Sequence, residues 1–323
     1  MVRRIASILA GLSVLFTTTA AWSQTYPSKP VKVVVGSASG ATPDVVARFI
    51  VQKLGDVWGS PVIVENRPGA AGMVASEFMT KSAPDGYTLL FSDNSSWAIN
   101  PHLFASIPYH PLKDFAPVIQ VGILPMFLVV IPSVPASSLP ELLDYARKNP
   151  GKLSYGSAGN GSIHHITTEL LKTMAGVDLV HVPYKGAAQF GTALLAAEIQ
   201  MAFSGYTGVA QGLGSGRLRM ISVSTAQRSP LLPNVPTVGE AGLAGFDMSA
   251  PIGFNAPAGT PRDVIAKLNA GIAAAVATQE VSSRMASLGI TVTATSPDQF
   301  GALIRAEYEK FGRLVKQSGA RVD

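Results

Sequence analysis

VKVVVGSASGATPDVVARF (Val31–Phe49) decides the fold, because a short apolar run enters a loop of small residues and then opens a helix. The same order returns in VIVENRPGAAGMVASEFM (Val62–Met79) and in LSYGSAGNGSIHHITTELLKTM (Leu153–Met174). A helix start leaves backbone N–H groups without intrahelical partners and carries partial positive charge. Several such starts facing one cleft, in loops small enough for close approach, would bind an anion without a charged side chain.

Strand-like and helix-like segments alternate through the rest of the chain. The predicted strands are short, β-branched or aromatic, and bounded by Gly, Pro or Asp. They cover 31–35, 61–65, 88–92, 127–131, 153–157, 179–183, 199–203 and 218–224, and helices are predicted at 43–59, 139–151, 186–198, 260–278 and 296–319. This alternation predicts the α/β class with mainly parallel sheets.

Helix starts carry capping signals. Thr42 is predicted as an N-cap, followed by proline at the first helical position and by Asp44 in the first turn. Asp44 could contact a ligand, or it could favour the helix dipole and pair with Arg48 four residues later, for which a structural role is expected. Ser138 and Glu141 have the spacing of a capping box.

Two stretches resemble joints between lobes. Val118–Pro125 is an apolar run broken by glycine and proline, and Gly239–Gly253 is rich in small residues. If both are crossings, the first lobe is discontinuous and covers 24–124 plus 248–323, and the second covers 125–247.

The composition indicates a globular protein that does not bind nucleic acid. The chain has 323 residues, of which 47% are hydrophobic and 14% charged, and a formal net charge of +5. Such a low charge fraction argues against disorder, and 323 residues suffice for two domains. No basic run accompanies the small positive charge, so nucleic-acid binding has little support.

The N-terminus has the pattern of a secretory signal peptide over 1–23. Arg3 and Arg4 precede the apolar run Ile5–Phe16, and Ala21 and Ser23 are small residues at the −3 and −1 positions of a cleavage site. The apolar run is short for a bilayer span, although an uncleaved anchor is the alternative. The chain has no cysteine, which excludes disulfides and thiol chemistry. We therefore expect a periplasmic protein.

The loop Gly156–Ser162 has the spacing of a phosphate-binding loop, but no lysine follows it. Nucleotide hydrolysis is therefore disfavoured, while the anion-binding geometry remains. His165 lies one helical turn after Ser162, where a cap or surface role competes with ligand contact. For the loops after 31–35 and 61–65, ordinary tight turns remain the alternative.

Enzymatic and metal sites have little support. The histidines lack metal-ligand spacing, no nucleophile elbow or telling carboxylate pair occurs, and no cofactor is expected.

Several segments resemble solute-binding receptors of tripartite tricarboxylate transporters, the Bug family. They are QTYPSKPVKVVV, VIVENRPGAAG, PDGYTLL, YGSAGNGSIHH, VPYKGAAQ, RSPLLPNVPTVGEAG and FNAPAGTP, in order from about residue 24 to 262. The resemblance implies a two-lobe periplasmic-binding-protein fold, type II-like, that closes about a hinge of two crossings on a small organic acid. Membrane transporter subunits are the implied partners, and we expect a monomer.

Carried over residue by residue, the resemblance implies ligand contacts on both lobes. The sequence departs from the family at Ala41, where a second glycine is usual, and at 204–206, where an acid is often found. Including the strand ends at 92 and 204–206, the candidate ligand-binding residues are Ser37, Ser39, Gly40, Thr42, Asp44, Ala70, Ala71, Gly72, Ser92, Ser157, Gly159, Asn160, Ser162, His165, Ser204 and Tyr206.

The expected function is a periplasmic receptor that captures a small carboxylate and delivers it to a membrane transporter. A secreted hydrolase or isomerase using His165, and a periplasmic sensor domain, are the alternatives.

Overall fold

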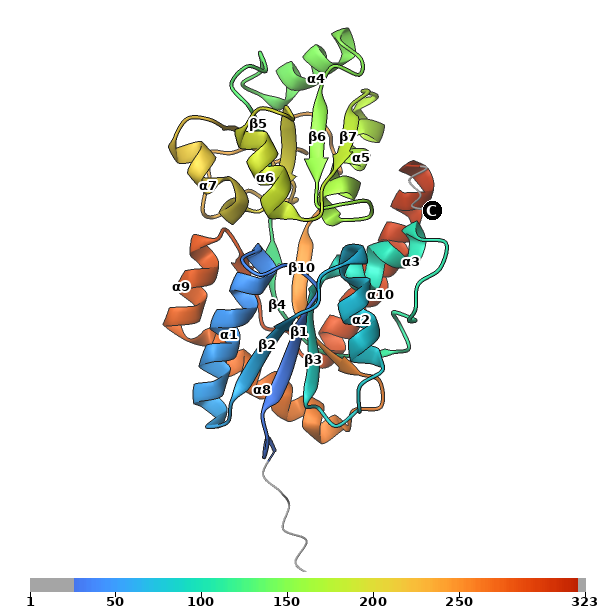
Figure 1. The fold of residues 1–323 in the computed structure, drawn as a ribbon, viewed down its shortest axis with the longest axis vertical. Coiled ribbons are helices and arrows are strands. Elements are labelled where there is room, and N and C mark those ends of the chain that lie inside the picture. Colours follow the sequence, from blue (N-terminus) through green and yellow to red (C-terminus); the bar gives the residue numbers. More distant parts are fainter. Residues whose placement is uncertain (1–25, 319–323) are drawn as a thin grey trace, which may run out of the picture.

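The computed structural model describes residues 26–318, which form two α/β lobes stacked end to end (Figure 1). The first sheet contains, in spatial order, β11 (Thr291–Val292), β4 (Phe115–Leu124), β10 (Ala250–Pro257), β3 (Thr88–Asp93), β1 (Val31–Val35) and β2 (Val62–Asn66). The second contains β7 (Val180–Pro183), β6 (Ser154–Ser157), β8 (Met201–Ser204), β5 (Phe127–Val130) and β9 (Arg219–Val223). The signal peptide expected over 1–23 lies outside the described residues.

Helices cover both sheets. Around the first sheet lie α1 (Thr42–Trp58), η1 (Ala70–Gly72), α2 (Met73–Thr80), η2 (Ser95–Ile99), α3 (Asn100–Leu103), α8 (Arg262–Ala277), α9 (Gln279–Ser287) and α10 (Pro297–Ser318). Around the second lie α4 (Leu139–Lys148), α5 (Ile163–Ala175), α6 (Ala187–Leu195) and α7 (Tyr206–Gly214). None of the helices in 26–318 is both long and apolar enough to cross a bilayer.

The predicted α/β class and two-lobe fold are confirmed, and each of the eight predicted strands is present. The sheets are mixed, however, and not mainly parallel as expected. β1 runs parallel to β2 and β3, but β10 runs antiparallel to β3 and β4. In the second lobe β6 is parallel to β7 and β8, and β5 is antiparallel to β8 and β9. The antiparallel strands β5 and β10 are those that carry the chain away from the other lobe.

Two strands occupy stretches that the sequence predicts as joints. β4 overlaps Val118–Pro125, and β10 begins inside Gly239–Gly253. A Cβ on Gly253 would lie 2.5 Å from the carbonyl oxygen of Ile119 and 2.7 Å from the Phe300 ring. Glycine therefore marks close approach in a buried strand here, and not the end of one.

The start of α1 differs from the prediction. Thr42 is already helical, and the N-cap is Ala41, whose methyl group caps nothing. The Thr42 hydroxyl instead contacts the Thr207 hydroxyl of the second lobe. The expected cap is therefore a contact between lobes. By contrast, Ser138 accepts a hydrogen bond from the Glu141 amide, as its capping signal predicts.

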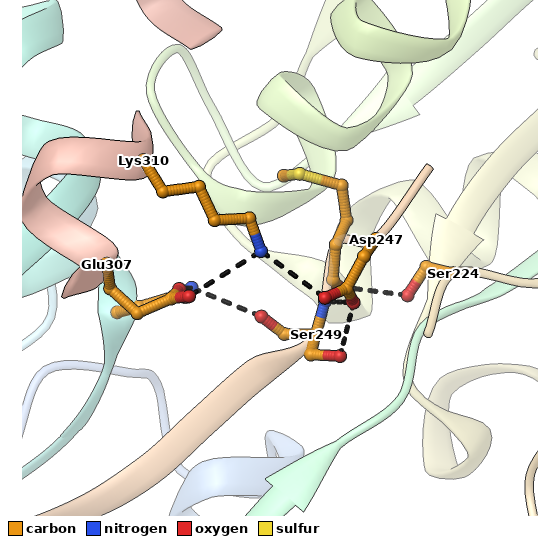
Figure 2. A network of polar contacts seen from close by, with 7 residues as sticks. Ser224, Asp247, Ser249, Glu307 and Lys310 are labelled. Atoms are coloured by element: carbon orange, nitrogen blue, oxygen red, sulfur yellow. Dashed lines mark hydrogen bonds and ion pairs between the residues drawn. The ribbon is translucent and has the colours of Figure 1, made fainter. Parts of the chain in front are cut away.

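One serine links both crossings between the lobes, and Figure 2 shows it beside the second of them. The Ser224 hydroxyl accepts a hydrogen bond from the Met126 amide at 3.2 Å and donates one to the Met248 carbonyl at 3.0 Å. Met126 lies between β4 and β5, and Met248 lies just before β10. The two connections therefore leave the second lobe side by side, as a hinge requires.

Charged groups fasten the second crossing to α10. Lys310 lies 3.4 Å from Asp247 and 3.5 Å from Glu307, and Glu307 accepts a hydrogen bond of 2.9 Å from Asn94 (Figure 2). Asp247 also accepts a 2.6 Å hydrogen bond from Ser249. The network fixes the crossing to the first lobe, because α10 packs against β4 and η2.

Candidate functional site

The first two strand–loop–helix units meet at one edge of the first sheet. A Cβ on Gly36, which follows β1, would lie 2.9 Å from Cα of Gly72 at the start of α2. In turn, a Cβ on Gly72 would lie 3.5 Å from the Ser96 hydroxyl of η2. Backbone therefore packs on backbone here, which only glycine permits at Gly36.

Asp44 holds the first loop in shape. Its side chain is 1% exposed and accepts hydrogen bonds from the Gly40 amide at 2.9 Å, Arg48 Nε at 3.0 Å and the Asn66 side chain at 2.7 Å. Burial alone would raise the pKa of this carboxyl, but the bonds from Arg48, Gly40 and Asn66 outweigh it and lower the pKa. The carboxylate is thus occupied by the protein itself, and the predicted pair with Arg48 is present.

The second helix start is strained. Ala70 and Ala71 have φ of 46° and 52°, in the left-handed region that costs an ordinary residue about 1 kcal/mol. The Asn100 side chain donates a 3.0 Å hydrogen bond to the Ala71 carbonyl and holds the turn. Strain of this kind is typical of functional turns, which supports the candidate residues in η1.

The third unit, after β6, is tied together by its own serines. The Ser162 hydroxyl donates to the Gly159 carbonyl at 2.7 Å and accepts from the His165 amide at 3.4 Å as the N-cap of α5. The Ser157 hydroxyl accepts from the Gly159 amide at 3.1 Å and bonds to Nε2 of His181 at 2.7 Å. The loop is therefore shaped in advance by hydrogen bonds within the second lobe.

His165 belongs to a stack of three rings. It lies 4.1 Å from the ring of His181, which lies 4.8 Å from the ring of Tyr155. Its Nδ1 accepts a hydrogen bond from the Gly161 amide at 3.3 Å. Burial lowers the pKa of His165, and burial followed by the charge of His165 lowers the pKa of His181 to about 4. Both rings are therefore neutral at pH 7.

We expect this stack to destabilise the protein as the pH falls. An unfolded histidine has a pKa of about 6.5, so protons bind the unfolded chain first and stability falls from there down to about pH 4. Melting temperatures between pH 8 and pH 4 check this, and His181→Phe should flatten the slope. The exposed His110 provides the control, since His110→Gln should leave the slope unchanged. Equal slopes in all three proteins would contradict the expectation.

The two lobes touch at the candidate loops. Besides the contact between Thr42 and Thr207, a Cβ on Gly205 would lie 2.9 Å from Oγ1 of Thr42. A Cβ on Gly161 would lie 2.8 Å from the Phe104 ring and 2.9 Å from Leu103. The start of α1 therefore meets the start of α7, and the third unit meets the end of α3, both where the two lobes touch.

The remaining candidates divide by position. Ser92 pairs with Gly253, whose missing side chain would meet Phe300, so Ser92 points toward α10. Ser39 and Asn160 are exposed, and Ser204 is buried and donates to the Gly205 carbonyl at 3.3 Å. Tyr206 begins α7 beside Phe127, with ring centres 6.2 Å apart. Ser92 therefore lies in the core of the first lobe. Ser39, Asn160, Ser204 and Tyr206 lie near the loops at which the two lobes touch.

Sequence reasoning missed Asp93, His181 and Thr207 at this site. Asp93 ends β3 with a half-buried carboxylate that burial gives a raised pKa. His181 is brought beside Tyr155 by the pairing of β6 with β7. The capping pattern at Thr42 concealed its contact with Thr207. A strand ending in an acid, TLLFSD, was the one signal available for Asp93.

No group of three or more metal-ligating side chains occurs within residues 26–318.

Comparisons with known proteins match almost the whole chain. A family model described as "Tripartite tricarboxylate transporter family receptor" matches residues 46–320. Protein BugT of Bordetella pertussis is 34% identical over 93% of this chain and 92% of its own.

Three solved structures share the fold. Rpa4515 of R. palustris, solved with adipate, is 32% identical, with a TM-score of 0.87 over 92% of this chain and 100% of its own. The periplasmic binding protein BugD is 31% identical, with a TM-score of 0.85 over 92% and 99%. MatC of Rhodopseudomonas palustris, with bound malate, is 31% identical, with a TM-score of 0.83 over 90% and 100%.

Proposed function

Since the chain belongs to the tripartite tricarboxylate transporter receptor family, we propose that it captures a small organic carboxylate between its lobes and delivers it to membrane transporter subunits. The adipate and malate found with two similar structures are both small dicarboxylates, which supports this class of ligand. The periplasmic relative BugD supports a periplasmic location. We further propose that residues 1–23 are a cleaved signal peptide and that the protein is a monomer.

The proposal rests on the helix starts that lie where the two lobes meet. The loops at 36–41, 70–72 and 157–162 contain no Lys or Arg, so their donors are backbone amides, hydroxyls and the side-chain amide of Asn160, all of them neutral. The Ser37 hydroxyl is buried and has no partner in the described residues, which leaves it available to a ligand. Charge-assisted hydrogen bonds from neutral donors are strong in a dry cleft.

The lobes in this proposal are the predicted ones, with 24–124 plus 248–323 as the first and 125–247 as the second. The ligand bridges Ser37, Thr42 and η1 on one side and the loop 157–162 on the other. Closure is a rotation about the two crossings joined by Ser224. A bridging ligand favours the closed arrangement because it gains contacts in that arrangement alone.

A panel of acids tests the proposal by thermal shift. We expect a fitting mono- or dicarboxylate to raise the melting temperature progressively with concentration. At one hundred times Kd the gain is about 2.7 kcal/mol, or roughly 5 °C for a protein of this size. The diamides of the same acids are the control, since they lack the charge. Ala71→Leu should weaken binding without unfolding the protein, because η1 lies at the site.

Catalysis has one observation in its favour, the contact between Ser157 and His181. The Ser157 side chain is fully buried, however, and its hydroxyl also bonds to Gly159. In the described part of the chain no hydrogen bond joins a carboxylate to His181, so the base is not oriented as in a triad. We therefore propose a receptor without catalytic activity. Turnover of an ester or amide, together with no stabilisation by any acid, would overturn it.

A further inference from the structure

The turn after β3 differs in chemistry from the loops around it. Asp93 is the last residue of β3 and is half-buried, and Asn94 directly after it is fully buried. The Asp93 carboxylate accepts a 2.9 Å hydrogen bond from the Ser95 amide. The side-chain oxygen of Asn94 has no partner in the described residues. Where the helix starts offer donors, this turn offers acceptors.

The turn lies among the candidate ligand-binding residues. β1 pairs with β3 so that Val35 is opposite Phe91, which brings Asp93 level with Ser37, two residues beyond. On its other side Asp93 is opposite Ile252, just after the crossing into β10. The Ser96 hydroxyl of the following η2 lies next to Gly72, as described above. Asp93 is therefore at the edge of the sheet that faces the second lobe, between two donor loops.

No cation within residues 26–318 forms an ion pair with this carboxylate. Buried Asp44 pairs with Arg48 at 3.0 Å, and Glu169 pairs with Lys172 at 2.9 Å. In the described residues Asp93 has no ion-pair partner, and the other titratable group close to it is Tyr109, whose hydroxyl donates to the Ser96 carbonyl at 2.7 Å. Burial raises the pKa of Asp93, and no positively charged neighbour offsets this effect. A carboxylate that is partly removed from water and has no ion-pair partner favours a positively charged one.

We propose that Asp93 determines ligand specificity and that the preferred ligand is a carboxylic acid that also carries a protonated nitrogen, bound by Asp93. This rests on the proposed receptor function and narrows its ligand class. The carboxylate of such a ligand binds the donor loops, and its ammonium group pairs with Asp93. An acid with a second carboxylate in the same place would meet Asp93 as a like charge, which is unfavourable.

Matched pairs of acids test the proposal by calorimetry at pH 7.5. The pairs are succinate with aspartate, adipate with 2-aminoadipate, and propionate with β-alanine. We expect the aminated member of the fitting pair to bind at least tenfold more tightly. Asp93→Asn should abolish this preference, while Asp114→Asn should keep it. Asp114 is the control because it is also half-buried in the first lobe but lies before β4, where it accepts a bond from His110.

The outcomes separate this inference from the proposed function. If acids bind but amination gives no advantage to the wild type, Asp93 does not select an ammonium group, and the receptor function stands. Dicarboxylates that bind more tightly as the pH falls would also overturn the inference, because Asp93 would then act as a protonated donor. If no acid of either kind binds, the proposed function itself fails. The wild-type pairs decide even if Asp93→Asn does not fold.

Discussion

Gly161→Ala is expected to weaken ligand binding about tenfold or more. Its Cβ would lie 2.8 Å from the Phe104 ring and 2.9 Å from Leu103, both in the other lobe. Overpacking of this kind costs about 1–3 kcal/mol, and the cost falls on the closed arrangement, where the lobes meet. Calorimetric titration with the acid found in the panel measures the loss.

Gly176→Ala is the matched control for this change. Gly161 and Gly176 lie at opposite ends of α5, with φ of 80° and 62°, so alanine strains the backbone at both. A Cβ on Gly176 meets nothing within 4 Å. We therefore expect Gly176→Ala to lower the melting temperature and leave Kd unchanged. Equal Kd values for the two variants would show that Gly161 has no part in closure.

Asp44→Ala is expected to lower the free energy of unfolding of the first lobe by about 1.5–3 kcal/mol, because the hydrogen bonds to a buried carboxylate are lost. The change leaves Gly40, Arg48 and Asn66 without the acceptor that joins them. Asp56→Ala is the control on the same helix, because its pair with Lys53 is exposed and such pairs contribute about 0–1 kcal/mol. Urea unfolding followed by circular dichroism measures both.

The effect of Asp44 also depends on pH. Because its pKa is lowered in the folded protein, the stabilisation is fully present above the unfolded pKa of about 3.9. It is lost as the pH falls from there through the folded value. The difference between wild type and Asp44→Ala should therefore shrink in acid. A difference that stays constant down to pH 2 would contradict the assignment.

Local sequence patterns predicted strands and helices well where interactions between residues close in sequence determine them. The run Val31–Val35 is a strand buried on both sides, and Asp44 pairs with Arg48 one turn later on α1. β4 and β10 were missed because Gly122 and Gly253 resemble strand breakers. Both instead lie where another group approaches too closely for a Cβ. A Cβ added at Gly122, for example, would lie 2.7 Å from the side chain of Ile290. Such a demand is set by tertiary packing and leaves no local signal.

The candidate site stays a prediction, and the sequence supplies its local parts alone. The glycine loops and His165 can be read along the chain, since each belongs to one strand–loop–helix unit. The partners of these residues cannot be read in this way. His181 meets Tyr155 through the register of two parallel strands, and Thr207 meets Thr42 across 165 positions of sequence. Asp93 gains its significance from the absence of a cation among its described neighbours, which composition does not reveal.

The contact between Thr42 and Thr207 has a consequence for discrimination. It joins protein to protein, so whatever free energy it adds to closure is added for every solute alike. Such a contact raises the affinity for every ligand by the same factor and leaves the ratios between ligands unchanged. Removing it at Thr207, which is not a proposed ligand contact, would give a receptor with the same selectivity and a lower affinity, so that affinity and selectivity could change independently during evolution.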